Sequence, residues 1–333
     1  MKRIMGVYDV DPFYADRFAE FANQKETIPF TAVAFTSVAR LKEYASQQPL
    51  ELLLVGDEVD EAELEGVKAG QIVRLSETGM AKDGSSVVYK YQSTDSVLRE
   101  VMACYQVQER PMPFVMTGIR SRIIGVYSPI GRCGKTSFAL TLGQVLARED
   151  KVLYLSLETC SGLSRLMCTE HNKTLADLVD CFRHGSYNHL RLGSMVYNWG
   201  GLDYVPPVAY LEDLADIQGM ELAGLISRIA GEGIYSAIVV DFGHFYDDVE
   251  QLLNLCSVIY VPTKEDVVSA ARLEEWKAYL EVSGRMELWD RVRMLKLPNS
   301  AAQVRRENYL EQLLWGELGD FARQLTGKQR GEG

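Results

Sequence analysis

Apolar residues in the first 108 positions follow two patterns, one typical of buried strands and one typical of helices. Short continuous apolar runs predict strands at Ile4–Tyr8, Phe30–Phe35, Leu50–Val55, Gln71–Leu75 and Ser86–Tyr91. Helical spacing predicts helices at Pro12–Asn23, with Phe13, Phe18 and Phe21 on one face, at Ser37–Ser46, and from about Asp95 to Val107. Strands that alternate with helices predict a parallel sheet covered on both faces.

A second series of strands and helices begins after a break between Glu109 and Arg120, where two prolines end the preceding helix. Its predicted strands are Ile123–Tyr127, Val152–Leu157, Ala237–Asp241, Ser257–Val261 and Val292–Leu297. Its predicted helices are Gly134–Arg148, Glu221–Ile229, Asp248–Leu255, Val267–Glu281 and Glu307 to about Leu325. We therefore expect an α/β chain with one domain at 1–108, a linker at 109–120 and a second domain with a mainly parallel sheet at 121–333.

Composition narrows the class of protein. Of 333 residues, 47% are hydrophobic and 24% are charged, which is typical of globular domains. The formal net charge of −11 argues against nonspecific binding of nucleic acid or of anionic lipid. The sequence contains no apolar run of membrane-spanning length, and its N-terminus shows no signal-peptide cleavage site. Six cysteines without a C-x-x-C pair predict reduced thiols and a cytoplasmic protein.

The strongest chemical signal is the segment Ile123–Val145, IIGVYSPIGRCGKTSFALTLGQV, in which a buried strand leads through a glycine-containing turn into a helix. This context is typical of a phosphate-binding loop. Gly131 and Gly134 let the backbone N–H groups converge on an anion at the helix N-terminus. Lys135 would reach the β- and γ-phosphates, and the Thr136 hydroxyl would ligate Mg²⁺. The alternative is a chance Gly-Lys-Thr sequence at the start of a helix.

An acidic strand end supplies a second part of the predicted site. Asp241 ends the predicted strand Ala237–Asp241 and is followed by Phe242 and Gly243. An aspartate in this place can hold the Mg²⁺ shell opposite the phosphates. The alternative is an ordinary polar residue at the end of a strand.

The loop PIGRCGKTS resembles the deviant Walker A motif of ParA/MinD-type ATPases, which runs Lys-Gly-Gly-x-Gly-Lys-Thr-Thr/Ser. The segment VLYLSLETCSGLSRLM, the VPP at Val205–Pro207 and the VVDFG around Asp241 follow in that family's order. With a receiver-like first half, the domain order is similar to that of TadZ/CpaE proteins. The resemblance implies a flavodoxin-like receiver domain followed by a P-loop NTPase domain. It implies that ATP and Mg²⁺ bind at Gly131, Arg132, Cys133, Gly134, Lys135, Thr136 and Ser137, with Asp241 behind the metal.

The same resemblance implies how such a protein acts. An ATP- and Mg²⁺-tuned homodimer would recruit or position the Tad/Flp pilus secretion machinery. Partner proteins would bring the cytoplasmic chain to the cell pole or the inner membrane face. No nucleic-acid partner and no integral membrane segment are expected.

Departures from the family pattern bear on catalysis. Ile130 stands where the family has the lysine that reaches across the dimer, and Arg132 replaces a glycine. The family's catalytic aspartate aligns with Ser156, which has no carboxylate to position water. Glu158 lies two residues later and can take this role if strand alternation turns it to the same side. We therefore expect weak or absent hydrolysis.

The first half also departs from the receiver pattern. Asp9 and Asp11 match the acidic residues after the first strand, Ser76 the hydroxyl after the fourth and Lys90 the lysine after the fifth. Gly56 stands where the phosphate acceptor belongs, and Asp57 is one residue out of register. Phosphotransfer is therefore not expected, and a dimer or partner surface is the favoured role. The alternative for Asp9, Asp11 and Lys90 is solvated loop charge.

Three further features have two interpretations each. Cys168, His171, Cys181 and His184 have zinc-ligand types and spacings, although buried thiols and surface histidines are favoured. Six acidic residues within Asp57–Glu65 form a solvated face or a docking surface for a basic partner. The stripe Leu310, Leu314, Leu318, Phe321 and Leu325 is expected to pack on the second domain's sheet, since its acidic polar face does not suit a membrane surface.

The sequence thus predicts an ATP-binding assembly or localisation protein with weak or absent ATPase activity. A nucleotide-empty dimeric scaffold, a ParA/MinD-like partitioning or positioning ATPase, and a small-molecule enzyme of the P-loop class are the alternatives.

Overall fold

The computed structural model describes residues 3–25, 30–78, 87–105, 120–167, 171–243, 249–298 and 309–330. The chain divides into two compact units, one of residues 1–113 with 188–194, the other of 114–187 with 195–333. Residues 188–194 thus group with the first unit, whereas the sequence placed them in the second domain. Residues 109–119 of the predicted linker lie outside the described residues.

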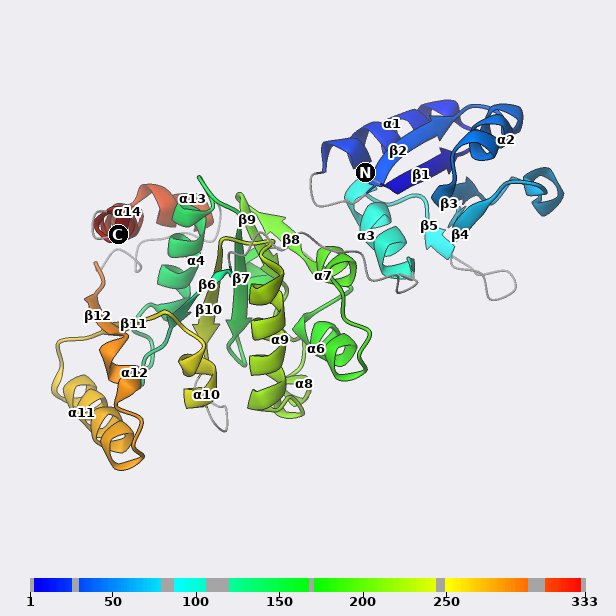
Figure 1. Ribbon diagram of the computed structural model, residues 1–333. Helices are drawn as coiled ribbons and strands as arrows, with labels where there is room; N and C mark the ends of the chain where they lie inside the picture. The colour runs from blue at the N-terminus through cyan, green and yellow to red at the C-terminus, as the bar shows by residue number, and fades with distance from the viewer. Residues whose placement is uncertain are drawn as a thin grey trace. The chain divides into compact units, whose positions relative to one another are not determined.

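The first unit is a doubly wound parallel sheet. Its strands are β1 (Arg3–Tyr8), β2 (Phe30–Phe35), β3 (Leu50–Gly56), β4 (Ala69–Ser76) and β5 (Val87–Tyr89). Its helices are α1 (Pro12–Gln24), α2 (Val38–Gln47), the 3₁₀ helix η1 (Glu61–Leu64) and α3 (Thr94–Cys104), together with α7 (His189–Met195), whose Leu190 joins this unit's core. The strand order in the described residues is β2-β1-β3-β4-β5, all parallel, which is the flavodoxin-like order (Figure 1).

Both faces of this sheet are buried, as its continuous apolar strand β3 predicts. Leu52 and Leu54 pack in the cluster that contains α1 and α3, whereas Leu53 and Val55 pack in the cluster that contains α2. Caps fix where the helices begin. Asp11 accepts from the Phe13 N–H at 3.0 Å before α1. Phe18 is buried, whereas Phe13, which was expected to share its helix face, lies in the first turn of α1 and is 77% exposed.

The second unit is a mainly parallel sheet with one antiparallel edge strand. Its strands are β6 (Arg122–Val126), β7 (Val152–Leu157), β8 (Tyr197–Trp199), β9 (Leu202–Val205), β10 (Ala237–Phe242), β11 (Val258–Thr263) and β12 (Val292–Lys296). Within the described residues the order is β12-β11-β6-β10-β7-β9-β8, with only β8 antiparallel (Figure 1). The hairpin β8–β9 was not predicted, since two strands of three and four residues leave too short an apolar pattern.

Helices surround this second sheet. They are α4 (Lys135–Leu146), α5 (Leu163–Met167), α6 (Leu175–Arg183), α8 (Leu211–Ala215), α9 (Gly219–Glu232), α10 (Val249–Asn254), α11 (Val267–Val282), α12 (Glu287–Asp290), α13 (Tyr309–Trp315) and α14 (Glu317–Arg330). α4 is buried along most of its length, and α9 packs against α6 and α10. Among the helices in the described ranges, none is both long enough and apolar enough to cross a bilayer.

The C-terminal apolar stripe packs inside the second unit. It forms two helices, α13 and α14, which both contact α4. Leu310 and Leu318 belong to the same apolar cluster as residues of α4 and of the central strands, and Phe321 and Leu325 pack against that cluster. The stripe is therefore buried inside the unit, and its helix contacts are with α4, which covers the sheet expected to receive it.

Leu318→Ala should lower the free energy of unfolding of the second unit by about 2–5 kcal/mol, since it leaves a cavity beside α4. All four tryptophans lie in that unit, so urea denaturation followed by tryptophan fluorescence reports its unfolding. Met220→Ala, at a side chain that is 70% exposed, should change the free energy by no more than about 0.5 kcal/mol. Equal effects of the two substitutions would contradict the packing.

Candidate nucleotide-binding site

The loop between β6 and α4 is anchored to the neighbouring strand at its start. The Ser128 hydroxyl donates to the Pro262 carbonyl of β11 at 2.8 Å and accepts from the Ile130 N–H at 3.2 Å. Pro129 has no N–H to donate. An anion cradle in this loop can therefore begin only after Ile130.

The second half of the loop is curled by left-handed backbone. Gly134, the N-cap of α4, has φ +88°, and Arg132 is the one non-glycine with positive φ among the described residues, at +55°. The Cys133 thiol turns inward and donates to the Ile130 carbonyl at 3.2 Å, whereas the Arg132 side chain is exposed. A turn of this kind at the N-terminus of a twelve-residue helix is suited to an anion.

Lys135, the first residue of α4, reaches across the end of β10. Its ammonium group donates to the Phe242 carbonyl at 3.0 Å and lies 3.0 Å from Oε1 of Glu158. The lysine is only 6% exposed. The structure thus brings Lys135 and Glu158, which are both predicted site residues, into direct contact.

Asp241, at the end of β10, is fully buried beside the start of α4. Its Oδ2 accepts from the Tyr154 hydroxyl at 3.1 Å, and the Thr136 side chain is hydrogen-bonded to the same carboxyl group. Burial raises the pKa of Asp241 to about 7, an effect that the Thr136 hydrogen bond opposes and the nearby Glu158 carboxylate reinforces.

One oxygen of this carboxylate fits a divalent cation. Oδ1 of Asp241 is buried and has no hydrogen-bond partner, which is costly for a charged group. A carboxylate oxygen and the neighbouring Thr136 hydroxyl are the hard oxygen ligands that Mg²⁺ prefers. The residues present therefore fit the predicted Mg²⁺ position.

Strand pairing explains why these residues meet. β10 lies between β6 and β7, and Asp241 is in register with Val126 and Ser156. Ser156 is buried, and Glu158, two residues later, lies on the side of Lys135. Glu158 lies beyond the end of β7, so it is the turn after the strand, and not strand alternation, that brings its carboxylate to Lys135.

Two contacting residues were missed by the sequence reasoning. Tyr154 supports Asp241 from β7, and the Tyr309 hydroxyl of α13 lies 2.8 Å from the Ser137 hydroxyl. For Tyr154 a signal existed, because Tyr154 and Ser156 lie two residues apart on one strand and so share a side. For Tyr309 there was none, since 172 residues separate it from its partner.

The first unit buries three of the four polar residues that match the receiver pattern, namely Asp9, Ser76 and Lys90. Lys90 lies 2.9 Å from Oδ1 of Asp9, and the Asp11 N–H donates to the same oxygen at 2.9 Å. Asp9, Ser76 and Lys90 are 2%, 0% and 8% exposed. The solvated-loop alternative is therefore wrong for Asp9 and Lys90, whereas Asp11 is exposed and caps α1.

Gly56 lies against this buried pair. A Cβ at this position would lie 2.9 Å from Oδ2 of Asp9. A larger side chain at the acceptor position would therefore require the Asp9 carboxylate to move. Asp57, the next residue, is half-buried, and its N–H donates to the Leu75 carbonyl at 3.0 Å.

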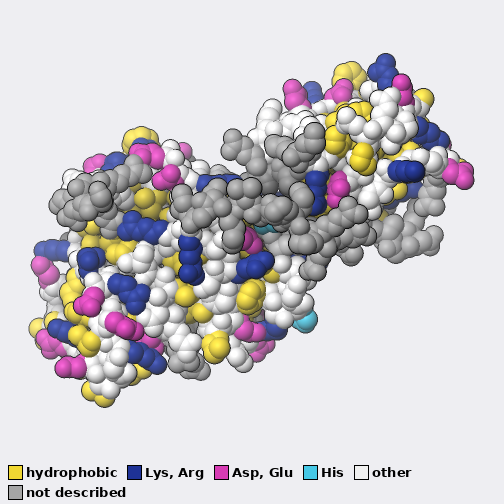
Figure 2. Space-filling view, in the orientation of Figure 1, with side chains coloured by type: hydrophobic (Ala, Val, Ile, Leu, Met, Phe, Trp, Pro, Cys, Tyr) yellow, Lys and Arg dark blue, Asp and Glu magenta, His cyan; other side chains and the backbone are white. Residues whose placement is uncertain are grey.

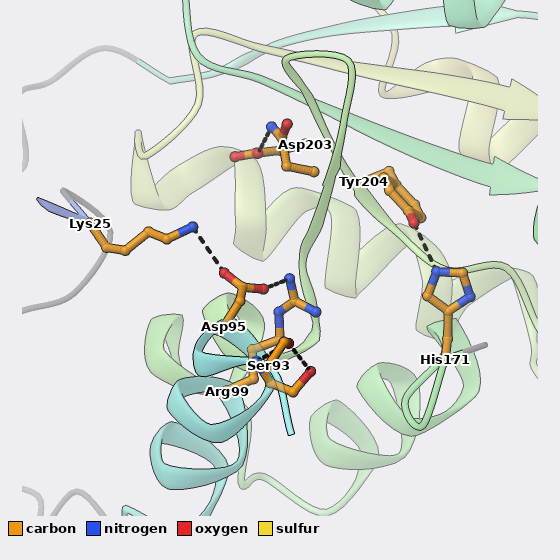
Figure 3. A network of polar contacts seen from close by, with 9 residues as sticks. Lys25, Ser93, Asp95, Arg99, His171, Asp203 and Tyr204 are labelled. Carbon is orange, nitrogen blue, oxygen red and sulfur yellow. Dashed lines mark hydrogen bonds and ion pairs between the residues drawn. The ribbon is translucent and has the colours of Figure 1, made fainter. Parts of the chain in front are cut away.

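The histidines of the zinc hypothesis have protein partners. His171 lies 2.8 Å from the Tyr204 hydroxyl, and Figure 3 shows its ring turned toward that tyrosine. His184 Nδ1 lies 2.9 Å from the Asp180 carbonyl. Cys168 lies outside the described residues, and no cluster of three or more metal-ligating side chains occurs in the parts of the chain that the structure describes.

No family model matches the chain, and no curated protein sequence matches it. Solved structures that resemble it include a ParA family ATPase from Chlorobium tepidum, with 18% identity and TM-score 0.48 over 62% of this chain and 98% of that one. Another is a Cyanothece McdA variant in complex with ATP, with 17% identity and TM-score 0.44 over 62% of this chain and 95% of that one. A third is the septum site-determining protein MinD from Pyrococcus horikoshii in complex with Mg-ADP. It has 18% identity and TM-score 0.41 over 58% of this chain and 77% of that one.

The raised pKa of Asp241 gives the second unit a pH-dependent stability. Between about pH 4 and 7 the folded carboxyl binds a proton that the unfolded one releases, so stability should fall as pH rises and level off above 7. The slope should reach at most about 1.4 kcal/mol per pH unit. Asp241→Asn should flatten it, measured by urea denaturation with tryptophan fluorescence in the absence of divalent cations; an unchanged slope would contradict the assignment.

Proposed function

We propose that this chain is an ATP- and Mg²⁺-binding assembly or positioning protein of the TadZ/CpaE type, with weak or absent hydrolysis. The observation that carries the proposal is the convergence of Lys135, Thr136, Glu158 and Asp241 beside a left-handed turn at the start of α4. A buried lysine, a metal-ligating hydroxyl and an unpartnered carboxylate oxygen form the set that phosphoryl groups with Mg²⁺ require.

Different residues of the site would bind the phosphates and the Mg²⁺ ion. The N–H groups of Gly131, Arg132, Cys133 and Gly134, and those of Lys135, Thr136 and Ser137 at the start of α4, would contact the phosphates. The Lys135 ammonium would contact the β- and γ-phosphates, and Thr136 and Asp241 would hold Mg²⁺. The bound group would supply negative charge and a divalent cation that this chain's residues then orient.

Weak hydrolysis follows from the polar residues beside Asp241. Ser156 has no carboxylate, and the carboxylate of Glu158, which follows β7, is paired with Lys135. The exposed Arg132 contributes no charge from inside the loop. We therefore assign a role in which binding, rather than rapid turnover, sets the state of the protein.

Partners of this protein are proposed to be proteins. The chain carries a net charge of −11, and Figure 2 shows acidic and basic side chains interspersed over the visible face rather than one basic field. The first unit, with Asp9 already paired to Lys90 and glycine at the acceptor position, would act as a dimer or partner surface rather than as a phosphate acceptor. Pilus-secretion proteins at the cell pole or the inner membrane face are the proposed partners, with the chain in the cytoplasm.

Lys135→Ala should reduce binding of a fluorescent ATP analogue at least 100-fold, because the ammonium group is the buried cation of the site. Fluorescence titration in the presence of Mg²⁺ measures the effect. Lys42→Ala, at an exposed position of the first unit, should bind the ATP analogue with the same affinity as the protein without substitution. Unchanged affinity in Lys135→Ala would refute the site.

The nucleotide-empty scaffold is the second candidate, favoured by the pairing of Lys135 with protein groups. If ATP tunes the dimer, ATP with Mg²⁺ should shift the full chain toward dimer in light-scattering chromatography, and Lys135→Ala should abolish the shift. A dimer that forms equally with and without nucleotide in both proteins would favour the scaffold.

A further inference from the structure

Two of the groups that hold Lys135 lie at the ends of different strands. Its ammonium donates to the Phe242 carbonyl of β10 and pairs with the Glu158 carboxylate that follows β7, each at 3.0 Å. The Glu158 side chain is 21% exposed and the lysine 6%, so little water screens the pair.

Close approach of the two strand ends makes this pair possible. A Cβ at Gly243 would lie 2.4 Å from the Leu157 carbonyl oxygen and 3.2 Å from Cα of Glu158. Any residue larger than glycine at 243 would therefore push the end of β7 away from β10. Gly243 keeps Glu158 near enough for its carboxylate to reach the lysine.

The pair has a consequence for ligand binding, since an ammonium group has three donors and one positive charge. A triphosphate brings several negative charges to the group that Glu158 now neutralises. Two anions on one partly buried cation repel each other strongly, because the low dielectric screens them poorly.

We infer that Glu158 is an internal competitor for Lys135, displaced when a nucleoside triphosphate binds. This inference rests on the proposed function and adds regulation to the same site. Glu158 lowers the affinity for nucleotide. It also makes the position of the turn after β7 depend on whether the loop between β6 and α4 has bound nucleotide. Its carboxylate becomes available to orient water only after Lys135 has exchanged it for the phosphates. Until then Glu158 acts as a positioning residue that holds the lysine side chain.

Glu158→Gln tests the competition, because the amide keeps the size of the side chain and removes its charge. Titration calorimetry with Mg²⁺ should show ATP binding about 10-fold tighter, which is about 1.4 kcal/mol. Binding of AMP, which has neither a β- nor a γ-phosphate, should be unchanged. Without nucleotide, the melting temperature of the variant should fall by about 3 °C, since the ionic contact between Lys135 and residue 158 is lost.

Glu274→Gln is the matched control, because it removes the same charge from an exposed position on α11. It should change neither the affinity nor the melting temperature. Weaker or equal ATP binding by Glu158→Gln would overturn the competition, and so would an equal gain for AMP or an unchanged melting temperature. If neither the unchanged chain nor the variant binds ATP, the proposed function fails and the inference with it; binding without the gain refutes the inference alone.

Discussion

Parallel pairing of β6, β10 and β7 is the constraint on which the candidate site depends. Each of these strands is buried along most of its length, so polar side chains gather where the strands end. In a parallel sheet all those ends lie at one edge. The loop before α4, Asp241 and Glu158 therefore meet there, although more than 100 residues separate Lys135 from Asp241.

Burial then sets the chemistry of that edge. Asp241 is fully buried with one unpartnered oxygen, and its pKa is raised to about 7. Lys135 is nearly buried and needs an anion, which Glu158 supplies. The site thus has its charges balanced in advance, and the tendency of Asp241 to gain a proton or a cation follows from the same low dielectric. The Asp9–Lys90 pair of the first unit repeats this principle at the edge of a smaller sheet.

Much of this architecture was predictable, because long apolar runs and strong caps specify elements locally. The strands β3, β7 and β10 and the helices α1, α4 and α11 lie within a few residues of their predicted bounds. Phe13 is exposed although it was grouped with Phe18, because helical spacing gives the face of a residue but not the burial of a helix end. The hairpin β8–β9 was missed because its strands are too short to show a period.

The sequence by itself determined the phosphate-loop motif, the acidic strand end and the departures at Ile130, Ser156 and Gly56. Only the tertiary structure decided which groups touch. It pairs Lys135 with Glu158, and the Tyr154 hydroxyl donates a hydrogen bond to Asp241. It also buries Asp9 in an ion pair with Lys90. The reason is physical: spacing along a strand gives the side of a residue, but the strand order and the close approach at Gly243 decide which side chains come within 3 Å of each other.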